Sequence, residues 1–228
     1  MSFHTTLVSD TESARQRLLQ TPIIQGALRG QVSVPSYLAF LREAYHHVRH
    51  TVPLLKAMKA ALPEHHRWLD AALDEYIEEE AGHDEWILND IAACGGDAEA
   101  VRHGRPSAAT ELMVAYAYDT VQRGNPLGFF GMVHVLEGTS VSLALLAADA
   151  IQRPLNLPDS GFSYLRSHGT LDQEHTAHFA LLMDQIADPK DQQAIVHAAR
   201  MFYGLYANVF ASLPLPQAQA GAPAEAAA

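Results

Sequence analysis

The sequence predicts an all-α fold. Almost every segment carries apolar residues at spacings of three and four, the period of an amphipathic helix. No segment shows sustained alternation of apolar and polar residues flanked by hairpin turns, the pattern of a strand. Neither an internal repeat nor a linker divides the chain. We therefore expect one helical domain over residues 1–213 and a disordered, low-complexity tail over residues 214–228.

Helix start and stop signals define seven helices. Ser33 is a suitable N-cap with Pro35 in the first turn, and Pro53 should kink the same helix. The Cys-Gly-Gly run at 94–96 and the Gly-Asn-Pro run at 124–126 should end helices. The expected helices are Thr11–Gln20, Val34–Leu62, Pro63–Cys94, Ser107–Arg123, Leu127–Ile151, Tyr164–Leu182 and Lys190–Leu213. The expected connections include a turn at Pro22 and a polar loop over Gly95–Pro106.

Composition excludes several classes of protein. No apolar run approaches the roughly 20 residues that cross a bilayer, so we expect no membrane span. A formal net charge of -11 argues against non-specific binding to nucleic acid or anionic membranes. The single cysteine, Cys94, allows no internal disulfide, and the N-terminal segment lacks a basic stretch followed by an apolar one. These features predict a cytoplasmic protein.

A first candidate metal-binding motif lies in the stretch 164–182. His168, Asp172 and His175 are spaced by four and three residues, which places them along one face of a helix. Two imidazoles and a carboxylate form a ligand mixture that iron, manganese or zinc accepts. Gly169 and Thr170 interrupt this stretch, so we expect one helical turn to end at His168 and Thr170 to cap the next. The competing interpretation is an exposed polar helix face.

A second motif is the pair Glu80 and His83. The three-residue spacing lets both side chains point inward from one helical turn, and Glu-x-x-His is the element that two-metal sites in helical bundles use. Glu79 is the alternative to Glu80. A solvated acidic helix face is the competing interpretation of the whole segment.

Glu137 is the third candidate, because it stands alone in a helix of apolar and small side chains. A buried carboxylate normally has a partner, takes a proton or binds a metal. A hydrogen bond to a tyrosine or histidine of a neighbouring helix would also explain it. His134, three residues before Glu137, could support the metal site, but we expect it to be a satisfied core histidine. His65 and His66 are expected to be solvated.

Together, three helices contribute three carboxylates and three histidines, enough for two divalent metals. The order of these motifs resembles the haem-oxygenase-like di-iron oxidase and oxygenase family, whose fold group includes TenA-type thiaminases and PqqC-type quinone-cofactor synthases. The resemblance covers about Pro22 to Leu213. It implies a seven-helix bundle, two non-haem irons, dioxygen as co-substrate, an external reductant and metal-dependent ordering of the last ligand helix. The ligands it implies are Glu80, His83, Glu137, His168, Asp172 and His175.

Among the reactions of that family we expect N-oxygenation of a small amine-containing metabolite. The basis is that Tyr45, His46 and His50 are spaced to line a polar pocket, although packing and a hydrogen bond across the bundle would also explain Tyr45 and His50. Cleavage of a carbon–carbon bond or decarboxylation by the same iron pair are alternatives. The expected partners are a small-molecule substrate and an electron donor, with a homodimer as one option for assembly.

Four other functions are possible for this fold group. A PqqC-like cofactor-free oxidase would use a basic pocket, for which the candidates are Arg42, His46, His47, Arg49 and His50. A thiaminase needs a cysteine nucleophile, whereas we expect Cys94 to be structural. Haem is disfavoured, since the segment that would carry its axial histidine has none. A non-catalytic binding module is the remaining alternative.

Overall fold

The computed structural model describes residues 2–215, except the side chains of residues 142 and 168–175. These residues form eleven α-helices and three short 3-10 helices and contain no strand, which confirms the predicted all-α class. The predicted tail, from residue 216 onward, lies outside the described residues. The helices are α1 (Phe3–Leu19), α2 (Pro22–Leu28), α3 (Val34–Val48), α4 (Thr51–Ala61), η1 (Glu64–Leu69), α5 (Asp70–Glu79), α6 (His83–Ala93), α7 (Ala98–His103), α8 (Ala108–Gln122), η2 (Pro126–Gly128), α9 (Phe129–Leu155), η3 (Asp159–Gly161), α10 (Ser163–Asp184) and α11 (Pro189–Ala211).

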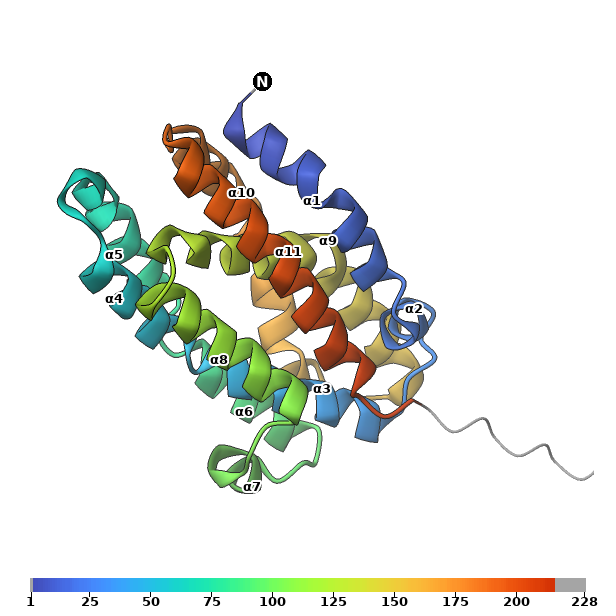
Figure 1. Ribbon diagram of the computed structural model, residues 1–228. Helices are drawn as coiled ribbons and strands as arrows, with labels where there is room; N and C mark the ends of the chain where they lie inside the picture. The colour runs from blue at the N-terminus through green and yellow to red at the C-terminus, as the bar shows by residue number, and fades with distance from the viewer. Residues whose placement is uncertain (1, 216–228) are drawn as a thin grey trace, which may run out of the picture.

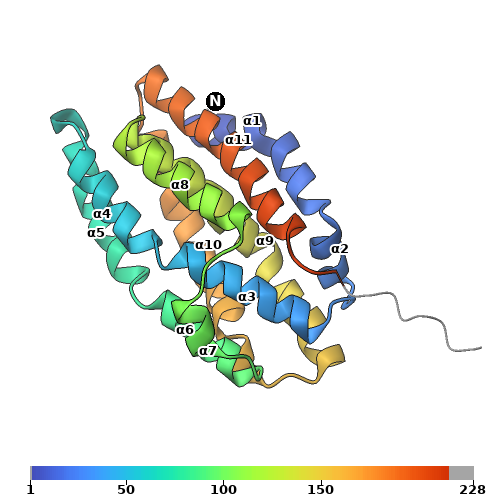
Figure 2. The ribbon, with the colours of Figure 1, turned by 60° about the horizontal axis from the view of Figure 1, so that its bottom comes forward.

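The helices pack as a bundle in which α11 lies between α1 and α8, with α9 behind it (Figures 1 and 2). The contact between α9 and α11 is very close. A Cβ atom at Gly131 would lie 2.5 Å from the backbone nitrogen of Ala199, so only glycine fits there. Helix α10 also packs along α9. Because α9 touches both, its side chains form the centre of the molecule.

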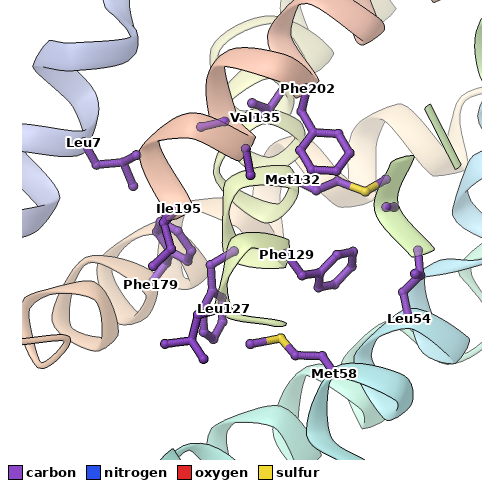
Figure 3. Packing of buried hydrophobic residues seen from close by; sticks show 14 of the residues in the cluster. Leu7, Leu54, Met58, Leu127, Phe129, Met132, Val135, Phe179, Ile195 and Phe202 are labelled. Carbon is purple, nitrogen blue, oxygen red and sulfur yellow. The ribbon is translucent and has the colours of Figure 1, made fainter. Parts of the chain in front are cut away.

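Two apolar clusters fill the bundle. The larger one contains Leu7, Leu54, Phe129 and Phe202, which come from α1, α4, α9 and α11, and Figure 3 shows how these side chains converge. The smaller one contains Tyr37 and lies between α3, α6, α9 and the start of α10. In the described part of the chain no single helix is long and apolar enough to cross a membrane. The segments Pro126–Val141 and Leu143–Leu155, which are bent by 47° relative to each other, would pass by length and composition if taken together.

The N-terminal helices differ from the prediction. Helix α1 begins at Phe3, eight residues before the predicted start, and the Ser2 hydroxyl caps it by accepting from the Thr5 amide. Its buried residues recur every three or four positions, as in any amphipathic helix. The predicted turn at Pro22 is wrong too, because this proline occupies the first turn of α2, where its missing N–H costs nothing.

Two segments that are each predicted to form one long helix form several shorter helices instead. The Ser33 cap is confirmed by its hydrogen bond from the Ser36 amide, but the helix ends at Val48, and α4 starts two residues before Pro53. Proline lacks the N–H that would continue the helix, so the break falls ahead of it. The segment predicted as one helix over 63–94 forms η1, α5 and α6. Short helix α7 occupies part of the predicted loop over 95–106.

A buried carboxylate links α6 to α10. Asp90 of α6 accepts hydrogen bonds from the Ser163 and Tyr164 amides, at 3.0 and 2.9 Å, and so caps the first turn of α10. Helix α10 then runs unbroken to Asp184, so the break predicted at Gly169 is not found.

The expectation that His66 is solvated is wrong. It is buried, and its Nε2 lies 2.7 Å from a carboxylate oxygen of Asp191 in α11. The other oxygen of Asp191 accepts from Asn125, which precedes η2. The physical reason is that η1 packs its second histidine inward, where a buried imidazole needs a partner. His65 is exposed, as predicted.

Candidate metal-binding cavity

A cavity of about 160 Å³ runs along α9 between α2, α3 and α11, and we call it the apolar cavity. Most of its lining is hydrocarbon, including Ile24, Leu28, Leu143, Ile151 and Phe210. Its carboxylates come from two separate elements, the end of α5 and the middle of α9. Further polar side chains in the lining include His47, Tyr76 and Tyr206.

Glu80 and His83 are close together, but not through one helical turn as predicted. Helix α5 ends at Glu79, Gly82 adopts φ 89°, and His83 is the first residue of α6. Glycine tolerates that left-handed backbone without strain. The turn places His83 Nδ1 3.2 Å from a carboxylate oxygen of Glu80, while the His83 ring stacks on Trp86. Glu80 lines the apolar cavity whereas Glu79 is exposed, which favours Glu80 as the inward-facing acid.

Glu137 lies halfway along α9 and lines the same cavity as Glu80. It is half-buried, and apart from His134 its neighbours in the middle of the helix are apolar or small. Two carboxylates that are distant in sequence therefore face one apolar space. An arrangement of this kind is costly unless the charges are compensated by partners, protons or a cation.

The remaining predicted ligands, His168, Asp172 and His175, have side chains outside the described ones. They belong to α10, which packs along α9. The described side chains alone bring together no group of three histidine, cysteine or acidic residues that could hold a metal ion. The donors they do supply, two carboxylates and the imidazole of His83, are those that iron and manganese accept, so the residues present fit such a metal.

The polar residues of α3 are oriented differently from the prediction. Tyr45 is buried in the smaller apolar cluster, and His46 is buried beside it. His50 Nδ1 lies 3.0 Å from a tyrosine hydroxyl of α8, which is the alternative hydrogen bond across the bundle. The residue that lines the apolar cavity is His47, whose ring packs edge-on against Tyr206. The polar pocket on which N-oxygenation was predicted is therefore not formed by the residues named.

The structure also changes the evidence for the competing functions. Of the five basic residues proposed for a quinone pocket, His47 lines the cavity, whereas Arg42 pairs with Glu43 at 2.8 Å and Arg49 lies over the ring of Tyr45. Cys94 caps the end of α6, only 9% exposed, and burial raises the pKa of its thiol to about 11. A thiol of this kind is a poor nucleophile, as expected for a structural residue.

His134 is a satisfied core histidine, as predicted. Its Nε2 lies 3.2 Å from the hydroxyl of Thr11. That hydroxyl donates its one proton to the Leu7 carbonyl at 2.7 Å, so His134 must donate to it from Nε2. Burial, helped by the charges of His4 and Arg15, lowers the pKa of His134 to about 4. The imidazole is therefore neutral at pH 7.

Two cavity residues were not singled out in the sequence. Tyr76 and Tyr206 are both buried and line the apolar cavity. In the sequence, each appears as a tyrosine on the apolar face of its helix. A tyrosine that only packs in the core gives the same pattern. Burial raises the pKa of Tyr206, so its hydroxyl stays protonated and can donate a hydrogen bond.

Residues 38–207 match a protein family described as iron-containing redox enzymes, and this segment is more than half of the chain. The chain belongs to this family. A comparison with curated proteins finds no match for this iron-containing redox enzyme.

Solved structures share the fold of this iron-containing redox enzyme. A domain of unknown function with a haem-oxygenase-like fold from Shewanella denitrificans superimposes with a TM-score of 0.80 at 23% identity, covering 92% of this chain and 90% of that one. A TenA homologue from Pseudomonas syringae gives 0.74 at 14% identity, covering 90% of each chain. The haem oxygenase of Leptospira interrogans gives 0.72 at 18% identity, covering 93% and 100%. The fold is thus haem-oxygenase-like, as predicted.

Proposed function

We propose that this iron-containing redox enzyme is a non-haem di-iron oxygenase whose substrate has one polar end and an apolar body. The observation that carries the proposal is the convergence of Glu80 and Glu137, from two separate helices, on a single cavity that is otherwise mostly apolar. Acidic side chains facing such a space are best compensated by cations.

The proposed ligand set combines the described donors with those of α10. Glu80, His83 and Glu137 would hold the metals from one side, and the side chains predicted as ligands on α10 would complete the site. These are His168, Asp172 and His175. Two irons bound there would activate dioxygen with electrons from an external reductant. The stacking of His83 on Trp86 fixes the orientation of its ring, which is what a metal-binding imidazole requires.

The shape of the cavity supports a substrate with a hydrocarbon part. From Glu137 to Ile151 its wall follows α9 over 14 positions, which is up to about 21 Å of helix axis. Apolar surface placed there gains roughly 25 cal/mol per Å² removed from water. A small polar amine would forgo this gain. Oxidative carbon–carbon cleavage or decarboxylation of an amphiphilic substrate is therefore favoured over N-oxygenation of a small amine.

The chain's own side chains have distinct tasks in this proposal. His47 and the protonated hydroxyl of Tyr206 would hold the polar end of the substrate by hydrogen bonds. Leu28, Leu143 and Phe210 would pack on its apolar body and keep water away from the reacting end.

Iron binding tests the site. Anaerobic reconstitution with ferrous iron should load two ions per chain and give an oxygen-dependent absorption change. Replacing Glu137 with glutamine, which has nearly the same shape, should remove at least one iron and abolish turnover. Glu111→Gln is the matched control, because Glu111 is exposed on α8 and lines neither the cavity nor the predicted site. Full loading and turnover in Glu137→Gln would show that the assignment is wrong.

A substrate panel tests the reaction class. Linear carboxylic acids and amines of increasing chain length are compared with small polar amines for stimulated oxygen uptake by the iron-loaded enzyme. We expect stimulation to rise with chain length until the cavity is filled. Stimulation by small polar amines alone would restore N-oxygenation as the better proposal.

A further inference from the structure

A second cavity, of about 190 Å³, lies between α1, α9, α10 and α11, and we call it the polar cavity. Its lining is richer in polar side chains than that of the apolar cavity, although Val8 and Phe179 also line it. It includes the side chains of His4, Thr11, Glu12, Arg15, His134 and Tyr203. Glu137 is the one residue of the described chain that lines both cavities. The candidate metal site can therefore be approached from two chemically different sides.

We infer that the polar cavity is the route by which a divalent cation such as ferrous iron reaches Glu137, an inference that rests on the proposed iron site. A hydrated ion loses much of its hydration energy when it enters an apolar space, so the apolar cavity is a poor path. The polar cavity instead offers the carboxylate of Glu12, the hydroxyls of Thr11 and Tyr203, and two imidazoles along the way. Substrate and metal would then use opposite sides of α9.

The charged side chains at this route predict whether a substitution there speeds or slows iron uptake. Glu12 and Arg15 are neighbours, with 3.7 Å between a guanidinium nitrogen and a carboxylate oxygen, and their side chains are 44% and 27% exposed. A carboxylate at the mouth attracts an approaching cation, and a guanidinium repels it. Glu12→Gln should therefore slow iron uptake and Arg15→Gln should accelerate it, each by about two- to threefold at low salt and less at high salt.

Gly138 provides a way to narrow the route. It lines the polar cavity, and in the described chain a Cβ built there meets no heavy atom within 4 Å other than those of its chain neighbours and its own helix backbone. Leucine at this position would extend into the cavity beside Glu137, and α9 gains a better helix former. Gly204 of α11 is the matched control, because a Cβ there also meets nothing and the residue is exposed and outside both cavities.

The experiment measures the rate of metal uptake rather than turnover. Metal-free protein is mixed anaerobically with ferrous ammonium sulfate in a stopped-flow instrument, and bound iron is counted at the end. We expect Gly138→Leu to load about tenfold more slowly than the parent but to reach the same stoichiometry. Gly204→Leu should load at the parent's rate. Ala147→Leu, which narrows only the apolar cavity, should weaken substrate binding and leave iron uptake unchanged.

The outcomes separate this inference from the proposed function. If the parent binds two irons and Gly138→Leu loads at the parent's rate, the route is wrong and the iron site stands. Equal slowing by Ala147→Leu would also overturn the route. If the parent binds no iron, the proposed function fails and the inference fails with it. Should Gly138→Leu not fold, the opposite effects expected for Glu12→Gln and Arg15→Gln decide the question.

Discussion

Acidification should destabilise the protein through His134. This histidine lies in α9 between the aromatic rings of Phe179 and Tyr203, and its Nε2 donates to Thr11. Burial, with a smaller contribution from the charges of His4 and Arg15, lowers its pKa to about 4. In the unfolded chain the pKa of a histidine is about 6.5. Between these values the unfolded chain binds more protons than the folded one.

The sign and size of the effect follow from that difference. Because the pKa of His134 is lowered by folding, its neutral form contributes stability that is fully present above about pH 6.5 and is lost as the pH falls towards 4. One pKa unit corresponds to about 1.4 kcal/mol, so the full loss approaches about 3 kcal/mol. Between pH 7 and pH 5, about 2 kcal/mol of unfolding free energy should be lost through this residue alone.

Urea unfolding followed by circular dichroism at pH 7 and pH 5 measures the effect. Other groups titrate in the same range, so the comparison is with His134→Gln, whose amide can still donate to Thr11 but cannot take a proton. The parent should lose about 2 kcal/mol more than this variant on acidification. An equal loss in both proteins would refute the reasoning, as would an NMR titration that places the pKa of His134 near 6.5.

Two further predictions concern buried groups of α6. Asp90→Ala leaves two amide groups in the first turn of α10 without their acceptor, and at about 1–3 kcal/mol for each the unfolding free energy in urea should fall by about 3 kcal/mol. Asp90→Asn keeps an acceptor oxygen, so its unfolding free energy should fall by less than that of Asp90→Ala. Equal losses in the two variants would argue against this capping role. Cys94, with a pKa of about 11, should resist an aromatic disulfide reagent at pH 8 until urea unfolds the chain. Rapid labelling of the native protein would contradict its burial.

The local signals in the sequence were sufficient for much of the fold. Ser33 caps α3 as predicted, and the Gly-Asn-Pro run at 124–126 separates α8 from the segment that begins α9. Such signals act within one turn of a helix, so they can be read without knowing the tertiary structure. The segment around Gly82 could not be read in this way. A single glycine costs a helix only about 1 kcal/mol, and packing decides whether the helix continues or turns.

The candidate site was predictable in part for the same reason. Glu80 and His83 do come together, because a three-residue spacing brings two side chains close either across a helical turn or across the tight turn at Gly82. Glu137 was recognisable as a lone acid in an apolar helix. Which of two adjacent histidines, His46 or His47, faces the cavity was not predictable. That choice depends on the rotation of α3 against its neighbours, and neighbouring residues on a helix point about 100° apart.

This limit also explains why the expected substrate class changes. The prediction of a small polar substrate came from one helix, whereas the walls of the apolar cavity come from several that are far apart in the sequence. Only His47 of the histidines considered on α3 lines it, and the hydrocarbon walls come largely from α2, α9 and α11. A pocket's polarity is a property of all its walls, so one helix of polar residues is weak support for a polar ligand. The acids that would bind metal can be recognised within single helices. Their prediction therefore agrees with the structure better than the prediction of the substrate does.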